Sequence, residues 1–382
     1  MSFVTNSHLP SLEGRIALAA TRPDPAPLRS LLSGDVDWAG LCRLAAMHGA
    51  LPLLYARLRD IAADLTPPEQ LASLRAQFIL NGQRNLRLTN RLVRVLGALS
   101  AVGVAAVPVK GPVLAVQAYG DLALRDFVDL DILIPRDALA PATAVLRALG
   151  YASVLGPGSP EEAAFERLDL ELPLSDGAVS LDLHWRLTER YLPLRVPLER
   201  WLAETRTTSL LGRPVQALTP ERTLYQLAIN GLRDGWSSLK TIADVAWLCH
   251  STPALDWARL WEETHRAGSQ RILGLGLALA RDLLGLALPA DAERRIDSDA
   301  GIAPLVAEIC AALLGPPRDG SYAFALYRRA RERAVDRLIC RMTPNPRDWA
   351  FVRLPRQLDW LYYAVRPVRL ATRAAAALRR RL

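Results

Sequence analysis

Residues 104–134 constrain the fold more than any other part of the chain. The run 104–109 is apolar and rich in valine, and a glycine and a proline follow it, so it predicts a short buried strand. Lys110 and Gly111 then form a turn, and Pro112 is well placed in the first turn of a helix. Residues 129–134 predict a second strand. The stretch is therefore predicted to form a strand, a turn, a helix and another strand.

The second strand carries two carboxylates on one face. Side chains alternate along a strand, so Asp129 and Asp131 point to one face while Leu130 and Ile132 point to the other. Their Cα atoms are expected to lie roughly 6 to 7 Å apart. At that separation the carboxylates repel each other unless a cation lies between them, and they can share one or two divalent ions. Taken alone, the pattern also fits the solvated face of an edge strand.

Lysine is rare in this chain, and one of its lysines lies at the turn. Lys110 and Lys240 are the only lysines among 47 basic residues. A lysine beside Gly111 in a chain that otherwise uses arginine favours a role for a compact ammonium group there. Gly111 allows another group to approach the backbone closely. We interpret Lys110 and Gly111 as a turn that holds phosphate groups; chance placement is the alternative.

A later strand supplies a third carboxylate. Residues 179–185 alternate, so Asp182 and His184 share one face. Another strand is expected over residues 168–174, and the Asp-Gly pair at 176–177 between the two strands is typical of a hairpin. We assign Asp182 to metal binding or to accepting the proton of an attacking group, with an ordinary hairpin residue as the alternative. His184 is interpreted as a packed or hydrogen-bonded residue.

Helical patterns surround these strands. Residues 1–30 contain four prolines and little periodicity, and they predict an irregular N-terminal segment. A further hairpin is predicted at 210–215. Amphipathic patterns predict helices over residues 37–48, 51–61, 66–100, 136–149, 219–232, 237–249, 257–265, 271–286, 303–314 and 322–337. The prediction is an α+β protein with a small mixed β-sheet: an N-terminal helical region (1–101), a core (102–218) and a C-terminal helical domain with a basic tail (219–382).

The composition is typical of a soluble globular protein. Hydrophobic residues make up 51% of the chain and charged residues 23%. The four cysteines are far apart and form no CxxC pair, which favours reduced thiols. A basic stretch followed by an apolar core is missing from the N-terminus, and the longest apolar region is interrupted by charges. We therefore expect a cytoplasmic protein without a transmembrane segment.

The net charge of +8 comes almost entirely from the C-terminal end. From Arg353 onward there are eight arginines and one acid, Asp359. The rest of the chain is close to neutral, so general binding of nucleic acid is not indicated. The basic tail could contact an acidic partner or a membrane surface, and a solvated helix face is the default interpretation.

The pattern resembles the nucleotidyltransferase superfamily with a DNA polymerase β-like core, and within it a group of uncharacterised bacterial nucleotidyltransferases. In the core, the resemblance rests on Lys110-Gly111, Tyr119-Gly120-Asp121, Arg125, Asp129, Asp131 and residues 182–185. Outside the core it rests on residues 37–38, 46–49, 84–86, 235–244, 348–349, 354–355 and 361–367. The resemblance therefore covers nearly the whole chain.

The resemblance implies a Mg²⁺-dependent reaction, with Mn²⁺ as a possible substitute. An acceptor would attack the α-phosphate of an NTP and release pyrophosphate, with the metal on Asp129, Asp131 and Asp182. Lys110, Gly111 and Arg125 would contact phosphates, with pairing to Asp121 or Asp126 as the alternative for Arg125. Lys240 and Asp244 would contact the nucleotide or the acceptor. The acceptor could be a small molecule, a peptide or a saccharide, and neither it nor the oligomeric state is predicted.

The sequence departs from the superfamily at two places. The turn reads Lys-Gly where the wider superfamily usually has Gly-Ser, and Asn230 stands where relatives often carry a histidine. Two other classes of function remain open. One is glycosyl or phosphoryl transfer to a peptide or polysaccharide precursor on the same core, and the other is non-catalytic nucleotide binding.

Overall fold

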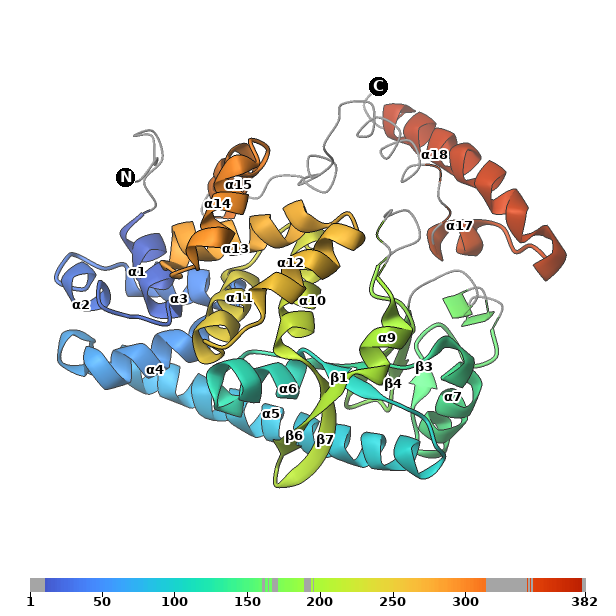
Figure 1. Ribbon diagram of the computed structural model, residues 1–382, viewed down its shortest axis with the longest axis horizontal. Helices are drawn as coiled ribbons and strands as arrows, with labels where there is room; N and C mark the ends of the chain where they lie inside the picture. The colour runs from blue at the N-terminus through green and yellow to red at the C-terminus, as the bar shows by residue number, and fades with distance from the viewer. Residues whose placement is uncertain are drawn as a thin grey trace.

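Helices surround one small mixed sheet, so the predicted α+β class is confirmed (Figure 1). The computed structural model describes residues 11–159, 162–163, 165–166, 171–188, 194, 196–313, 342, 344 and 346–379.

The sheet has five strands in the order β1-β2-β5-β4-β3. The strands are β1 (Val107–Val109), β2 (Asp129–Leu133), β3 (Ala152–Ser153), β4 (Glu171–Ser175) and β5 (Ser180–His184). β2 and β5 pair in parallel, while the pairs β1–β2, β4–β5 and β3–β4 are antiparallel. The three strands expected around the acidic residues are present, and the Asp-Gly turn joins β4 to β5 as a hairpin. Residues 168–170 of the expected strand lie outside the described residues.

One face of the sheet is apolar and packs against two helices. These are α5 (Pro68–Ala101) and α7 (Leu139–Ala148). Leu130 and Ile132 of β2 are fully buried in the same cluster as Leu92 of α5 and Leu146 of α7. Because side chains alternate along a strand, burial of Leu130 and Ile132 on this face turns Asp129 and Asp131 to the other.

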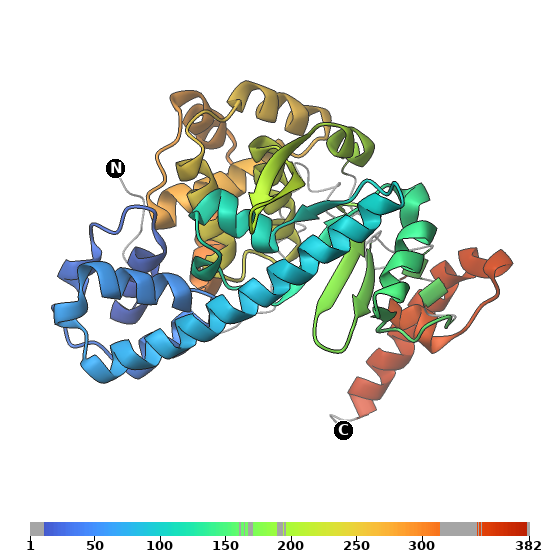
Figure 2. The same cartoon turned by 90° about the horizontal axis from the view of Figure 1, so that it is seen from below.

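Helix α5 is 34 residues long and crosses the molecule from the N-terminal helices to the sheet (Figure 2). Asn81 and Asn85 on this helix donate side-chain hydrogen bonds to backbone carbonyls of residues 122–125. That segment contains a 3-10 turn, Leu122–Leu124, and leads into β2. The helix thus supports the sheet and fixes the chain that enters its acidic strand.

The N-terminal segment is more ordered than the sequence predicts. Helices α1 (Leu12–Thr21) and α2 (Leu28–Leu31) precede the expected α3 (Trp38–Met47) and α4 (Leu51–Ile61), so the prediction of an irregular segment is wrong from residue 12 onward. Ser11 caps α1, and Ile16 and Ala20 are fully buried. Much of the buried face of α1 is alanine, whose close packing leaves little hydrophobic periodicity to detect. Residues 1–10 lie outside the described chain.

The segment after the sheet begins with α9 (Leu198–Ala203) and the two-stranded hairpin of β6 (Thr205–Leu210) and β7 (Arg213–Leu218). Five predicted helices follow: α10 (Pro220–Arg233), α11 (Leu239–Ser251), α12 (Trp257–Arg266), α13 (Gln270–Leu284) and α15 (Ile302–Leu313). A further helix between α13 and α15, α14 (Ala290–Ser298), was not predicted. The predicted helix at 322–337 lies outside the described residues.

One apolar core joins parts of the chain that are far apart in sequence. It contains Leu54 of α4, Val109 of β1, Leu227 of α10 and Leu277 of α13. The N-terminal helices and the helices after the sheet therefore pack on each other as well as on the core strands. The division at residues 101 and 218 stays a prediction.

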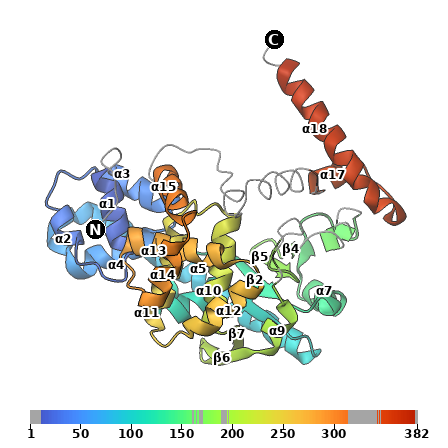
Figure 3. The ribbon, with the colours of Figure 1, turned by 45° about the horizontal axis from the view of Figure 1, so that its top comes forward.

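The C-terminal end forms α17 (Pro346–Phe351), a 3-10 turn (Arg356–Leu361) and α18 (Tyr362–Arg379). The Asp348 carboxylate is fully buried and accepts hydrogen bonds from Arg366 and Arg369, which ties α18 to α17. Figure 3 shows α18 extending away from the other helices. Over the described chain, helices long and apolar enough to cross a membrane are not found.

Candidate active site

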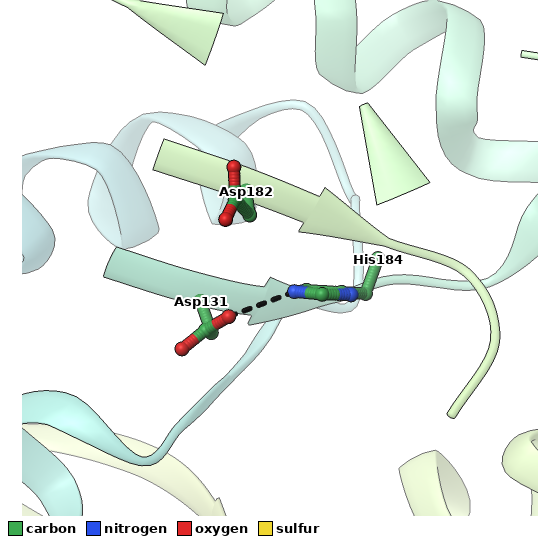
Figure 4. A group of neighbouring side chains, drawn as sticks. All are labelled: Asp131, Asp182 and His184. Carbon is green, nitrogen blue, oxygen red and sulfur yellow. Dashed lines mark hydrogen bonds and ion pairs between the residues drawn. The ribbon is translucent and has the colours of Figure 1, made fainter. Parts of the chain in front are cut away.

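Two carboxylates lie side by side on the polar face of the sheet. In the parallel pair of β2 and β5, Asp131 is the register partner of Asp182. Leu133, two residues further along β2, is the register partner of His184. Asp131, Asp182 and His184 each offer one ligand atom, and these atoms lie within 4.8 Å of one another (Figure 4). The sequence predicted the two acids, and the strand register brings them together.

His184 is held between two carboxylates. Its Nε2 lies 2.8 Å from Asp131 Oδ1, and its Nδ1 lies 3.1 Å from Glu171 Oε2 on the neighbouring strand β4. Burial alone would lower the pKa of His184, but the hydrogen bonds to Asp131 and Glu171 outweigh it and raise the pKa to about 9. The imidazole is therefore protonated at neutral pH and donates from both nitrogens. The expectation of a hydrogen-bonded histidine is confirmed.

The three acids carry more negative charge than their surroundings neutralise. Burial, together with the charge of Asp131, raises the pKa of Asp129. Burial and the charge of Glu171 raise the pKa of Asp182 to about 6. Only Asp131 has a lowered pKa: burial opposes ionisation, but Lys110, whose Nζ is 3.8 Å from Asp131 Oδ2, and His184 favour it. Two of the three carboxylates thus lack sufficient positive charge nearby.

These side chains fit a hard divalent cation. Asp131 and Asp182 offer neighbouring carboxylate oxygens, and Asp129 lies two residues before Asp131 on the same strand face. Carboxylates are the preferred protein ligands of Mg²⁺ and Mn²⁺. His184 is geometrically within reach, but both of its nitrogens already bond to carboxylates, so we regard the three acids as the available ligands.

The turn at residue 110 has an unusual backbone. Lys110 has φ 52° and ψ −137°, and Gly111 has φ 36°. Positive φ is costly for a residue with a Cβ, by about 1–3 kcal/mol. The carbonyl of Lys110 accepts a hydrogen bond from Leu114 N at 2.9 Å and so begins α6 (Gly111–Leu114), which continues as a π-helical turn (Ala115–Tyr119). A Cβ at Gly111 would lie 3.7 Å from the carbonyl oxygen of Asp129, so the turn lies at the start of β2.

Arg125 is buried and forms an ion pair with the helical segment after the sheet. Its Nε and Nη2 donate to the two carboxylate oxygens of Asp244 on α11, each at 2.8 Å. Tyr119 also donates to Asp244, at 2.8 Å, and its ring stacks on Trp247. Pairing with Asp121 or Asp126 was the alternative left open for Arg125; in the structure Asp121 caps the 3-10 turn at residues 122–124 and Asp126 pairs with Arg84.

Lys240 lies at the same end of β2 as the turn. Its Nζ donates to the carbonyl oxygen of Asp126 at 3.2 Å. Burial and the charge of Arg125 lower the pKa of Lys240, while Asp129 is one of the charges that raise it. The two lysines of the chain therefore both lie near the acidic strand, one beside Asp131 and one near Asp129.

Residues missed by sequence reasoning lie next to the acids. Glu171 belongs to the alternating pattern of β4, but only the register with β5 places it opposite His184. Arg233, at the C-terminal end of α10, has its Nη2 3.7 Å from Glu171 Oε2. The signal for Glu171 was its polar position in a predicted strand. The sequence held no comparable signal for Arg233, because its proximity depends on how α10 packs.

The site thus combines a mixed sheet, adjacent acids on paired strands and a lysine-glycine turn beside them. This arrangement is the one expected for the nucleotidyltransferase class. The chain belongs to the uncharacterised nucleotidyltransferase family, whose family model matches residues 34–285. The resemblance seen in the sequence is confirmed.

Among solved structures, the chain is similar to the antibiotic-resistance factor ANT(2'')-Ia. The two are 16% identical, and the match covers 50% of this chain and 95% of that chain at a TM-score of 0.35. No curated protein matches the chain.

Proposed function

We propose that the protein transfers a nucleoside monophosphate from an NTP to an acceptor, with release of pyrophosphate and with Mg²⁺ or Mn²⁺ as the metal. The observation that carries this proposal is the register pairing of Asp131 with Asp182, with Asp129 on the same face. Burial and neighbouring carboxylates raise the pKa values of Asp129 and Asp182, and a divalent cation would offset this cost of keeping them ionised.

The metal would be held by Asp129, Asp131 and Asp182, and it would neutralise charge on the phosphates. His184 and Glu171 orient Asp131, since the His184 Nε2 hydrogen bond fixes Oδ1 of that carboxylate. Lys110 and Gly111 would contact the phosphates of the nucleotide. Lys240 would contribute positive charge near Asp129.

Asp182 is also suited to accept the proton of an attacking hydroxyl. A general base works best when its pKa lies near the working pH, and burial raises the pKa of Asp182 to about 6. Asp131, whose pKa is lowered, is a poorer base. We therefore assign the proton to Asp182 as the alternative to metal binding, for the case in which the acceptor is a hydroxyl and this carboxylate does not hold the metal.

Arg125 is assigned to positioning rather than to phosphate binding. Its side chain is 6% exposed and two of its nitrogens donate to Asp244. Its backbone carbonyl accepts a hydrogen bond from Asn85 of α5. Arg125 therefore fixes the segment that leads to Asp129, and Asp244 serves as its partner rather than as a contact of the substrate.

Calorimetric titration tests the metal assignment. Each NTP is titrated into the wild-type protein with and without Mg²⁺, and binding is expected only with the metal. The double variant Asp129→Asn/Asp131→Asn removes two ligand charges, and we expect it to lose this Mg²⁺-dependent binding. The control Asp297→Asn removes a carboxylate of α14 that is 66% exposed and pairs with Arg281, and it should bind like wild type. Unchanged Mg²⁺-dependent binding by the double variant would exclude the assignment.

A further inference from the structure

A small open pocket lies beside His184, toward the ends of β2 and β5, and Lys110 of the turn also borders it. Its polar lining comprises Lys110, His184, Arg186, Gln226, Asn230 and Arg233. Arg186 follows β5, and the last three residues lie on α10. The pocket therefore forms where α10 packs over the polar face of the sheet.

The amide of Asn230 points to a ligand. Asn230 is 6% exposed, and its Nδ2 is buried without a hydrogen-bond partner among the described residues. A buried donor left unpaired costs about 1–3 kcal/mol, so such groups are rare unless something binds them. Gln226 lies one helical turn earlier, is 4% exposed and lines the same pocket. Two buried amides on one helix face thus border the cavity.

The charge of the lining selects an anion. Three basic side chains, those of Lys110, Arg186 and Arg233, border the pocket, and the described lining contains no acid. Arg233 also contacts Glu171, which fixes the guanidinium at the pocket edge. Arginine and amide donors together recognise phosphate oxygens through directed hydrogen bonds.

The pocket and two of the proposed nucleotide contacts, Gly111 and Lys240, lie toward opposite ends of β2, and Lys110 lies between them. Gly111 and Lys240 lie near Asp129 and Asp126, at the start of the strand. The pocket reaches Leu133, four residues later, or about 13 Å along the strand. In phosphoryl-group transfer the attacking and leaving oxygens lie roughly in line. If the pyrophosphate leaves near Gly111, the acceptor enters from the end that holds the pocket.

We propose that this pocket binds a phosphate monoester carried by the acceptor. The identification of the ligand as the acceptor rests on the proposed function, whereas phosphate binding by the pocket requires neither metal nor nucleotide. Lys110 lies at the boundary, since it lines the pocket and its Nζ is 3.8 Å from Asp131. The phosphate of the acceptor would thus be anchored on one side of Lys110 and its reacting group placed beside the acids.

The test uses inorganic phosphate as the probe, titrated into the full-length protein without Mg²⁺ or nucleotide at fixed ionic strength. Asn230→Leu should weaken phosphate binding by about tenfold, the effect of one hydrogen bond to a charged group. It should leave the melting temperature unchanged or higher, because Nδ2 of the wild-type amide is buried without a hydrogen-bond partner among the described residues. Gln226→Leu should also weaken binding, and Asn90→Leu, an exposed position on α5, should not.

A second titration separates the two possible sources of phosphate. Mg²⁺-ATP is titrated with and without saturating inorganic phosphate, and its affinity is expected to stay the same. Competition between phosphate and Mg²⁺-ATP would assign the pocket to the nucleotide and overturn the acceptor assignment. The proposal that the pocket binds phosphate would be overturned if both Asn230→Leu and Gln226→Leu kept the wild-type phosphate affinity, or if the wild-type protein showed no saturable phosphate binding. Failure of nucleotide transfer alone would leave the phosphate titration unaffected and would count against the proposed function instead.

Discussion

At the scale of single residues, His184 links the sheet and the acids most directly. It donates to Asp131 and Glu171 from two different strands, and its charge stabilises both carboxylates. A histidine buried between two acids is charged in the folded state and far less so in an unfolded chain at neutral pH. Its contribution to stability therefore depends on pH.

We predict that His184 stabilises the fold more at lower pH, as long as its partners Asp131 and Glu171 stay ionised. The pKa of His184 is raised from 6.5 to about 9, so its stabilisation is fully present below pH 6.5 and is lost as the pH rises through 9. Urea unfolding of wild type and His184→Gln at several pH values measures this. The difference in unfolding free energy should shrink steadily from pH 6.5 to above pH 9.

The exposed His265 provides the control, because His265→Gln removes a histidine of α12 that bonds only to Gln270 among its described partners. Its difference from wild type should change little over the same pH range. A constant difference for His184→Gln would show that the imidazolium is not stabilised as described.

The sequence predicted some residues of the site well and others poorly, for a physical reason. Asp129, Asp131 and Asp182 were found because each lies on a strand whose alternation is visible in the chain itself. Their roles stay predictions. The sequence did not identify Asp244 as the partner of Arg125, because Asp244 is far away in sequence and only the packing of α11 brings it near. Charge pairs over such separations leave no local pattern.

At the scale of elements, α5 holds the segment before β2 in place through side-chain hydrogen bonds. Asn85 is fully buried, and its Nδ2 donates to the carbonyl oxygens of Leu122 and Arg125, both at 2.7 Å. These carbonyls belong to a segment without strand partners of its own. Asn85 thus takes the place of backbone hydrogen bonds that a regular element would supply.

Asn85→Ala is therefore expected to destabilise the protein by about 1–3 kcal/mol, because it leaves buried carbonyls unpaired. Thermal unfolding followed by circular dichroism measures the change. Asn90→Ala on the same helix is the matched control, since Asn90 is exposed and donates within α5 to Leu86. The control should change stability by less than about 0.5 kcal/mol. Equal effects of the two substitutions would contradict the stabilising role of the Asn85 hydrogen bonds.

Elements with strong local signals were predicted accurately, and those that depend on packing were not. Helix α4 coincides with the predicted residues 51–61, because its apolar spacing is regular. Helix α1 was missed since its buried face is mostly alanine, and α14 since only Ala292 and Ile296 of its nine residues are buried. The parallel pairing of β2 with β5 also had no signature in the sequence, although it positions the site.

At the scale of the whole molecule, Trp236 packs between α10 and α13, two of the helices after the sheet. It is 1% exposed, and two glycines of these helices leave room for its ring. A Cβ at Gly231 would lie 2.4 Å from the indole, and one at Gly276 would lie 2.7 Å from it. Side chains at either position would push α10 away from α13, and α10 carries the amides of the pocket.

Gly276→Ala is predicted to destabilise the fold by about 1–3 kcal/mol through this overpacking. Gly97→Ala, on the exposed face of α5 with nothing within 4 Å, should instead stabilise it by about 0.5–1 kcal/mol. Chemical denaturation of both variants measures the two signs. A neutral or stabilising effect of Gly276→Ala would show that the interface around Trp236 adjusts easily.

The backbone of Lys110 sets limits on how this family site can vary. A glycine there would relax the positive φ of 52° but would remove the ammonium beside Asp131. Any other residue would keep the strain, and among those only arginine would keep a permanent charge, with a broader and flatter head group. No standard side chain satisfies both the conformation and the charge without compromise. In a chain whose basic residues are almost all arginines, this position carries a lysine on a backbone that favours glycine.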